Sequence, residues 1–389
     1  MVSGHTRAVD FLRFSGNVPP SSAAHDFKWD NERRRSMNIL VVGAGPTGLT
    51  AAVELARQGI VPVVAEKRPE GSGLSRAVGI LPESLELLAP SGTAQALLRK
   101  AMRIERAKIF LGDTLKVTLP LDISDDLHDT AVALPQDRTE EILRERLAAF
   151  GGAVSFDREV VDITQNATGV DVSFANGRRQ RADYVIAADG VHSRIRTALG
   201  IAYGGRDIEE IWSIADVNAR DWPHDRSFVL ARANTGHMAV VAHMAPQRYR
   251  VVSNTPDALK SLRLPMDVTR INRQGQFHLA ARQAKRYQMG RVFLAGDAAH
   301  CHSPVGGRGM NLGIADAADL ARRLIADDLD GYHDARHAAG AKILAETERL
   351  RLFLSSSRAV NTLTIRAALT LAGALPPLRR RIANRFLHG

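Results

Sequence analysis

The sequence predicts an α/β fold into which a β-rich region is inserted and which ends in helices. A strand–glycine–helix–strand pattern fills residues 37–67, and two later apolar runs, at 182–190 and 291–296, also end in glycine. Between those two runs, residues 212–277 change to short alternating strands with turn residues. Buried parallel strands are continuous apolar runs, whereas half-buried strands alternate. The chain is therefore expected to cross twice between a parallel sheet and a second, sheet-rich part.

The first unit is a βαβ motif of about thirty residues. NILVV (38–42) is a buried strand, PTGLTAAVELARQG (46–59) is a helix that closes on glycine, and IVPVVAEK (60–67) is a second strand. Further along, AKIFLGDTLKVTL (107–119) resembles a hairpin, and RTEEILRERLAAFG (138–151) is an amphipathic helix. VDITQNATGVDVSFANG (161–177) predicts two strands joined at a turn. After the last buried strand, helices are expected to the end of the chain.

Composition excludes several classes of protein. The chain has 389 residues, enough for two domains at about 150 residues each. Its formal charge is +10, but the arginines and lysines are spread out, and no nucleic-acid module accompanies them. We therefore expect a solvated basic surface and no nucleic-acid partner. The single cysteine, Cys301, excludes a disulfide framework and suits the cytoplasm. Residues 1–36 lack a run long enough for a signal peptide, and we expect them to be a disordered or non-native extension.

The first glycine cluster predicts a dinucleotide site. Gly43, Gly45 and Gly48 have the G-x-G-x-x-G spacing, with Pro46 and Thr47 between the last two. The first glycine allows a tight turn, the second lets the backbone approach a pyrophosphate, and the third lets the helix pack closely. Glu66, next to Lys67, follows Gly43 by 66 − 43 = 23 residues, near the spacing of a ribose-binding acid. The alternative is that Glu66 is a helix or surface acid. This cluster does not decide between NAD and FAD.

Three motifs in order make a more specific case. GAGPTG (43–48), AADGVHSRIR (187–196) and GDAAHCHSPVGGRGMN (296–311) resemble the FAD-dependent aromatic hydroxylases of the para-hydroxybenzoate hydroxylase type, which are single-component flavoprotein monooxygenases. SRAVGILPESLELL (75–88) and ALPQDRTEEILRERL (133–147) also match, so the resemblance covers Met37 to about Arg323. It implies a Rossmann-like, glutathione-reductase-type FAD-binding domain with an inserted substrate domain. We expect the FAD-binding domain at 37–110, 133–200 and 285–330, the β-rich substrate domain at 111–132 and 201–284, and a C-terminal helical region at 331–389.

The resemblance also implies roles for individual residues. Glu66 would hold the adenosine ribose, and Asp297 the ribityl chain or ribose hydroxyls. The other cofactor positions implied are Arg76 near the pyrophosphate, Gln136 and Arg138 near the flavin, Asp189 and Gly190 for both FAD and NAD(P)H, Pro304 along the flavin, and Gly307, Gly309, Met310 and Asn311 past its pyrimidine edge. A carboxylate only accepts hydrogen bonds, so Asp297 suits a polyol and would repel a phosphate. The start of the helix from Met310 would stabilise negative charge on a reduced flavin.

Several residues admit a second interpretation. Arg308 would add positive charge beside the flavin loop, and the alternative is that it points to solvent. His300, Cys301 and His302 are adjacent and cannot readily converge on one ion, so no metal site is predicted. Cys301 is expected to be structural because nothing suggests a partnered base. The chain has no second G-x-G-x-x-G, which argues against a separate NADPH domain.

The resemblance implies an enzyme in which NADH or NADPH reduces FAD and O2 forms a C4a-hydroperoxyflavin. That species would hydroxylate an aromatic substrate, phenolic or polyketide-like. The alternatives are a related FAD-dependent reductase or dehydrogenase without oxygen insertion, or a non-catalytic flavin-binding protein. Catalytic candidates are limited to Pro304 and Arg308, through the flavin environment, because the cofactor performs the chemistry. Candidates that face the substrate, if they are not core residues, are Trp212, His237, Met238 and His243. The tail from 364 is basic and apolar; Arg366 and two prolines exclude a spanning helix and leave at most a weak membrane contact.

Overall fold

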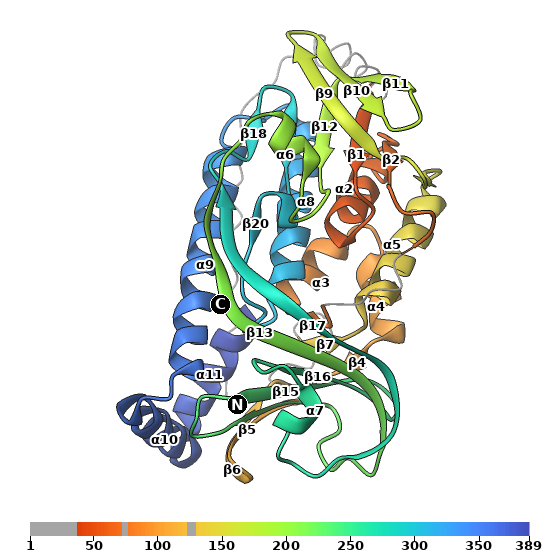
Figure 1. The fold of residues 1–389 in the computed structure, drawn as a ribbon. Coiled ribbons are helices and arrows are strands. Elements are labelled where there is room, and N and C mark those ends of the chain that lie inside the picture. The colour runs from red at the N-terminus through yellow and green to blue at the C-terminus, as the bar shows by residue number, and fades with distance from the viewer. Residues whose placement is uncertain (1–36, 72–76, 123–129, 389) are drawn as a thin grey trace, which may run out of the picture. The chain divides into compact units, whose positions relative to one another are not determined.

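The computed structural model describes residues 37–71, 77–122 and 130–388. Residues from Asn38 onward form one compact unit. The prediction for residues 1–36 and the one for Arg76 lie outside the described residues. The predicted α/β architecture is confirmed, with a βαβ unit, an inserted β-rich part and C-terminal helices (Figure 1).

A six-stranded sheet holds the predicted buried strands. Its order is β18-β19-β12-β1-β2-β8, and all its strands are parallel except β18. The strands are β1 (Ile39–Val42), β2 (Val63–Ala65), β8 (Val154–Ser155), β12 (Tyr184–Ala187), β18 (Gln288–Met289) and β19 (Val292–Leu294). β1, β12 and β19 are the three apolar runs that end in glycine, and their side chains are almost wholly buried. The sequence places them 100 residues or more apart, yet they are neighbours in the sheet.

Three helices pack side by side along this sheet. They are α2 (Pro46–Ala56), α5 (Gln136–Ala149) and α8 (Gly309–Ala326), with α2 in contact with both others (Figure 1). α2 is buried from Gly48 to its end; its residues there are small or apolar except Glu54, which pairs with Arg57. α5 buries Ile142, Leu143 and Leu147 on one face, as its pattern predicted.

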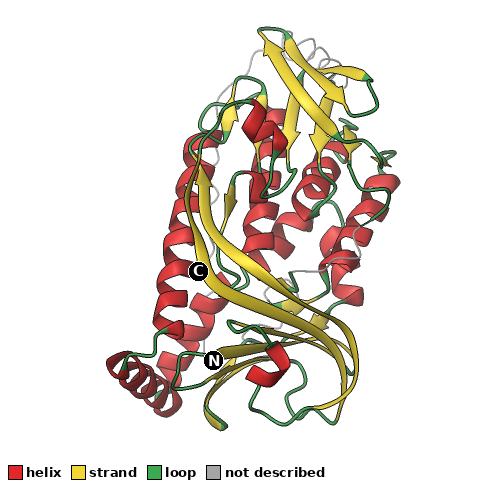
Figure 2. Cartoon of the chain, viewed as in Figure 1, coloured by secondary structure: helices red, strands yellow, loops and turns green. Residues whose placement is uncertain are grey.

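The inserted part is an eight-stranded sheet in the order β20-β17-β13-β16-β15-β14-β5-β6, in which every neighbouring pair is antiparallel except β14 with β5. Figure 2 shows two long, curved strands of this sheet in yellow. Its strands are β5 (Arg106–Leu111), β6 (Thr114–Pro120), β13 (Tyr203–Arg220), β14 (Ser227–Arg232), β15 (Met238–Ala245), β16 (Arg248–Ser253), β17 (Asp267–Ala284) and β20 (His300–Cys301). The β5–β6 hairpin was predicted, but residues 106–110 were assigned to the FAD-binding part. Their pairing with β14 places them in this second sheet. The division into domains otherwise stays a prediction.

The remaining elements connect and cover the two large sheets. Two small sheets contain β3 (Gly79–Ile80), β4 (Met102–Arg103) and β7 (Val132–Ala133), and the predicted strands β9 (Val160–Asn166) and β10 (Gly169–Phe174) with β11 (Arg179–Ala182). The other helices are α3 (Pro82–Leu88), α4 (Thr93–Lys100), α6 (Arg194–Ala198), α7 (Ala258–Ser261), α9 (Tyr332–Ser355), α10 (Ala359–Ala374) and α11 (Pro376–His388). α9 lies along β17, whereas α10 and α11 pack on β6. None of the helices within the described ranges is long and apolar enough to cross a membrane.

Candidate functional site

The three sequence motifs meet at the carboxyl ends of three adjacent parallel strands. Gly43 follows β1, Asp189 follows β12, and Gly296 follows β19. Val42 is paired with Ala187, and Ala187 with Leu294, so the three strands end level with one another. In the sheet, β2 lies on one side of β1 and β12 on the other, so the order of the strands changes direction at β1. Such a change of direction is where open α/β sheets bind ligands.

The glycine loop after β1 has the geometry that a pyrophosphate needs. Gly43 has φ +103°, and a Cβ there would lie 2.2 Å from the Ala188 carbonyl oxygen. A Cβ on Gly48 would lie 2.0 Å from the Gly43 oxygen. Around Gly45, in contrast, a Cβ would meet no atom within 4 Å. Gly45 also precedes the first turn of α2, which has no acidic residue and no side-chain cap. Two glycines therefore permit packing, and the middle one leaves room for a phosphate at a helix N-terminus.

Glu66 lies beside this loop. Its Oε2 accepts a hydrogen bond from the Ala44 amide at 2.8 Å, and its Oε1 accepts from Arg68 Nε at 2.9 Å. Burial alone would raise the pKa of Glu66, but the hydrogen bonds from Arg68 and Ala44 outweigh it and hold the pKa below its usual value. Glu66 is therefore a buried carboxylate at the end of β2, as a ribose ligand would be. Lys67 is exposed, and its neighbour Arg68 is the residue that pairs with the acid.

Thr47 joins the first glycine motif to the third. A Cβ on Gly296 would lie 2.4 Å from Thr47 Oγ1, and a Cβ on Gly313 would lie 2.3 Å from the same atom. The Thr47 side chain thus fills the space between the turn after β19 and the second turn of α8. Thr47 was predicted in the cofactor loop, but this second contact has no signal in the sequence, because it depends on two glycines about 250 residues away.

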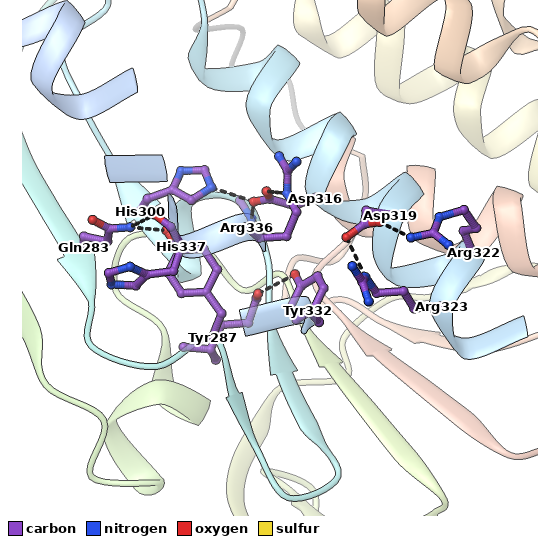
Figure 3. Close-up of polar contacts among 12 residues, drawn as sticks. Gln283, Tyr287, His300, Asp316, Asp319, Arg322, Arg323, Tyr332, Arg336 and His337 are labelled. Carbon is purple, nitrogen blue, oxygen red and sulfur yellow. Dashed lines mark hydrogen bonds and ion pairs between the residues drawn. The ribbon is translucent and has the colours of Figure 1, made fainter. Parts of the chain in front are cut away.

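A buried charge network holds the turn that contains Asp297. This turn is a 3-10 helix, η2 (Gly296–Ala298), and Asp316 of α8 accepts a hydrogen bond from the Gly296 amide at 3.0 Å. Figure 3 shows Asp316 between His300 and Arg336, and Arg336 Nε donates to its Oδ1 at 2.7 Å. The Asp297 side chain is itself exposed, just beyond the carboxyl end of β19. Asp316 and Arg336 were not among the sequence candidates.

Asp189 and Gly190 form the loop after β12. Asp189 Oδ2 accepts from the Ile195 amide at 3.3 Å, and burial raises the pKa of this carboxyl. Arg196, further along the same motif, donates to the carbonyls of Val191 and Ala298 and lies over the Tyr203 ring. The second motif is therefore tied to the third. The second arginine of AADGVHSRIR, Arg196, was the signal for this contact, although no role was predicted for it.

The segment from Pro304 to Asn311 contains the loop before α8 and the first residues of that helix. Pro304 is exposed, and Gly307 has φ +66° with no atom within 4 Å of a Cβ. Gly309 and Met310 form the first turn of the helix. The Asn311 side chain makes four hydrogen bonds, to Gly79, Leu81, Ser84 and Gly307, which use both its donors and both its acceptor sites. Asn311 thus holds two loops together, and its side chain has no hydrogen-bonding group left for a cofactor.

The side chains of Gln136, Arg138 and Arg308 each bind other groups of the protein. Gln136 accepts from the Ala77 amide at 3.2 Å and donates to Glu140, while Arg138 is exposed and pairs with Glu141. The Arg308 guanidinium donates to the Arg385 carbonyl at 3.2 Å, at the C-terminal end of α11. It therefore contacts another helix rather than only solvent. A role for these three side chains at the flavin stays a prediction.

The residues of the HCH run point to different partners. His300 contacts Asp316, whereas His302 Nδ1 lies 2.9 Å from the Ser303 carbonyl and therefore donates to it. Burial, with His300 and Arg308 nearby, lowers the pKa of His302 to about 4, so this imidazole is neutral near pH 7. Burial raises the pKa of Cys301, so its thiol is protonated.

The substrate candidates separate into two groups. Trp212 and Met238 are buried in one apolar cluster, against which Val305 of the Pro304 loop packs. His243 stacks on Tyr249 at 4.8 Å and accepts from the Arg226 amide, and His237 is exposed. Only Trp212 and Met238 therefore adjoin the loop next to the predicted flavin position.

Comparison with known proteins agrees with this geometry. The chain matches the FAD binding domain family over residues 36–261 and 254–347. A rifampicin monooxygenase from Streptomyces venezuelae is 33% identical over 336 residues, which cover 80% of this chain and 70% of that protein. The p-nitrophenol 4-monooxygenase of Pseudomonas putida shares the fold, with a TM-score of 0.83 at 24% identity over 90% of this chain and 97% of that one. The aklavinone-11 hydroxylase, solved with FAD and aklavinone, is 27% identical, with a TM-score of 0.67 over 82% and 69% of the two chains. The resemblance drawn from the three motifs is confirmed, and this chain belongs to the FAD binding domain family as one of the FAD-dependent aromatic hydroxylases.

Proposed function

We propose that this protein is an FAD-dependent monooxygenase that takes electrons from NADH or NADPH and inserts one oxygen atom of O2 into an aromatic small molecule. The observation that supports this most strongly is the meeting of the three motifs at the ends of β1, β12 and β19, with Thr47 packed between two of them. When bound, FAD supplies the redox and oxygen chemistry. The residues of the chain bind it, orient it and keep water away.

Each part of the site takes one part of the cofactor. The amides at the start of α2 would hold the pyrophosphate beside Gly45, and the Glu66 carboxylate would accept from the adenosine ribose. Asp297 would accept from hydroxyls of the ribityl chain. The amides of Gly309 and Met310, in the first turn of α8, would stabilise negative charge on the reduced flavin.

The substrate is an aromatic, polyketide-like compound. The names of a rifampicin monooxygenase and an aklavinone hydroxylase among the relatives support this class. In this chain, Val305 of the Pro304 loop packs against the buried apolar cluster that contains Trp212 and Met238, so this side of the predicted flavin position is apolar. An apolar lining favours a ring system over a charged aliphatic substrate.

A panel of aromatic compounds tests the function. We expect the purified protein to be yellow with bound FAD and to oxidise NADH or NADPH faster when a substrate is added. Oxygen should be consumed, and the product should gain one oxygen atom by mass spectrometry. NAD(P)H oxidation that leaves no oxygen in any product would favour a reductase. A bound flavin that NAD(P)H does not reduce with any compound would favour a non-catalytic flavin-binding protein.

A further inference from the structure

The outer face of α10 is apolar and has no protein partner within the part of the chain that the structure describes. Val360, Leu363 and Leu371 are 72%, 68% and 55% exposed. With Ala367 and Ala374 they recur at three- and four-residue intervals, so they form one stripe along the helix. The opposite face, with the buried Ile365 and Ala372, packs toward β6. The solvent side of α10 is therefore this stripe, Val360–Leu363–Ala367–Leu371–Ala374, while the other side of the helix packs against β6.

The chain around this stripe is strongly basic. From Arg349 to the end there are eight arginines and no aspartate or glutamate. Arg380 and Arg381, in the first turns of α11, are exposed, and neither pairs with a carboxylate among the residues described. An apolar stripe flanked by arginines is the composition of a helix that lies in the interface of an anionic bilayer.

A cleft of about 360 Å³ lies between β6 and the start of α11. Arg106, Arg379 and Arg380 line it together with a single carboxylate, Asp122. It adjoins the end of α10, because Pro376, which lines it, follows the last residue of α10, Ala374, by two residues. Three guanidinium groups against one carboxylate favour an anionic group such as a phosphate.

We propose that α10 and the start of α11 dock on the surface of an anionic lipid bilayer. The stripe enters the acyl boundary, the arginines face the headgroups, and the cleft receives a lipid phosphate. A second copy of the chain fits this surface less well. A two-fold contact would bring the arginines of both copies together, and the segment has no acid to balance them.

Vesicle co-sedimentation of the FAD-bound protein tests the stripe. We expect binding to vesicles of phosphatidylcholine with phosphatidylglycerol and little binding to phosphatidylcholine alone. Leu363→Ser with Leu371→Ser should weaken binding by about tenfold or more, because two exposed apolar side chains no longer enter the bilayer. The matched control is Val161→Ser with Ile271→Ser, at residues that are 40% and 50% exposed on other elements, and it should bind like the wild type. Unchanged binding by the leucine variant would overturn the proposal.

A second pair of variants tests the charge. Arg380→Gln with Arg381→Gln should weaken vesicle binding by about fivefold per arginine, the effect of one basic residue near an anionic surface. Arg178→Gln with Arg179→Gln, at two exposed residues where β11 begins, makes the same change of net charge and should have no comparable effect. Equal losses of vesicle binding in both variants would show that binding follows net charge alone, and would overturn the proposal that this surface docks on the bilayer.

Two further outcomes would also contradict the proposal. Displacement of the protein from vesicles by inorganic phosphate, but not by chloride at equal ionic strength, would assign the cleft to a free phosphate. A dimer in light scattering that Leu363→Ser with Leu371→Ser dissolves, without any vesicle binding by the wild type, would assign the stripe to a second copy of the chain.

Discussion

His300 Nε2 lies 2.5 Å from Asp316 Oδ2, and both side chains are buried. Burial alone would raise the pKa of Asp316, but His300 and Arg336 outweigh it and hold the pKa below its usual value. Asp316 is thus a carboxylate, and the imidazole Nε2–H donates to it. Because the same carboxylate accepts from the Gly296 amide, the buried charges fix the turn that presents Asp297.

Asp316→Asn should destabilise the protein and weaken FAD binding. Asparagine keeps the shape but removes the charge that His300 and Arg336 share, and breaking a buried pair costs about 3–5 kcal/mol. Thermal unfolding and FAD fluorescence titration measure the two effects. Asp319→Asn is the control, because Asp319 pairs with Arg322 and Arg323 on the same helix (Figure 3). Wild-type FAD affinity in Asp316→Asn would contradict a positioning role.

Gly313→Ala should cost about 1–3 kcal/mol, because the new methyl group would overlap Thr47 Oγ1. Gly313 is within a helix, so alanine introduces no backbone strain there. Thr47→Ala removes the clashing atom and should restore part of the loss in the double variant. A double-mutant cycle by denaturant unfolding measures this coupling. Additive single effects would show that Thr47 does not fill the space between α2 and α8.

Gly45→Ala should weaken FAD binding while the unliganded protein keeps its stability. Gly45 has φ −77°, which alanine adopts readily, and its Cβ would enter the open space beside α2. The contrasting variant is Gly43→Ala, which should destabilise the fold itself because of its positive φ and the contact with Ala188. Unchanged FAD affinity in Gly45→Ala would place the pyrophosphate elsewhere.

Asp297→Ala should lose bound FAD with the fold intact, since its side chain is exposed. Absorbance at the flavin band and circular dichroism report the two properties. Asp334→Ala, at a 91% exposed side chain on α9, should keep full FAD content. Full FAD retention by Asp297→Ala would contradict its assignment to the ribityl chain.

The free energy of unfolding should fall as the pH is lowered from 6.5 to 4, and His302 should cause part of this fall. The folded pKa is about 4 and the unfolded value is 6.5, so in this range the unfolded chain takes up the proton first. Protonation therefore favours unfolding as the pH falls, by on the order of 2 kcal/mol. Urea unfolding at several pH values measures the slope. His302→Asn should show a smaller fall, and an equal slope would place the titration on other groups.

Sequence reasoning succeeded where local pattern decides structure. The strands that end in Gly43, Gly190 and Gly296 were predicted, because continuous apolar runs with terminal glycines suit few alternatives. It did not find the contacts made across the fold. The Arg308 interaction with α11 depends on how a helix 77 residues away packs, and the use of the Asn311 side chain depends on β3. Neither partner leaves a periodic signal in the sequence.

The position of β19 also has a consequence for synthesis of the chain. β1 and β12 are complete by residue 187, but β19 and α8 follow only at residues 292–326. Until then, β12 is the open edge of an unfinished sheet, and Thr47 has neither Gly296 nor Gly313 beside it. Five strands of the eight-stranded sheet, β13 to β17, are made during this interval. The cofactor cradle therefore closes late in translation, and until it closes the growing chain exposes an apolar strand edge of the kind that promotes aggregation.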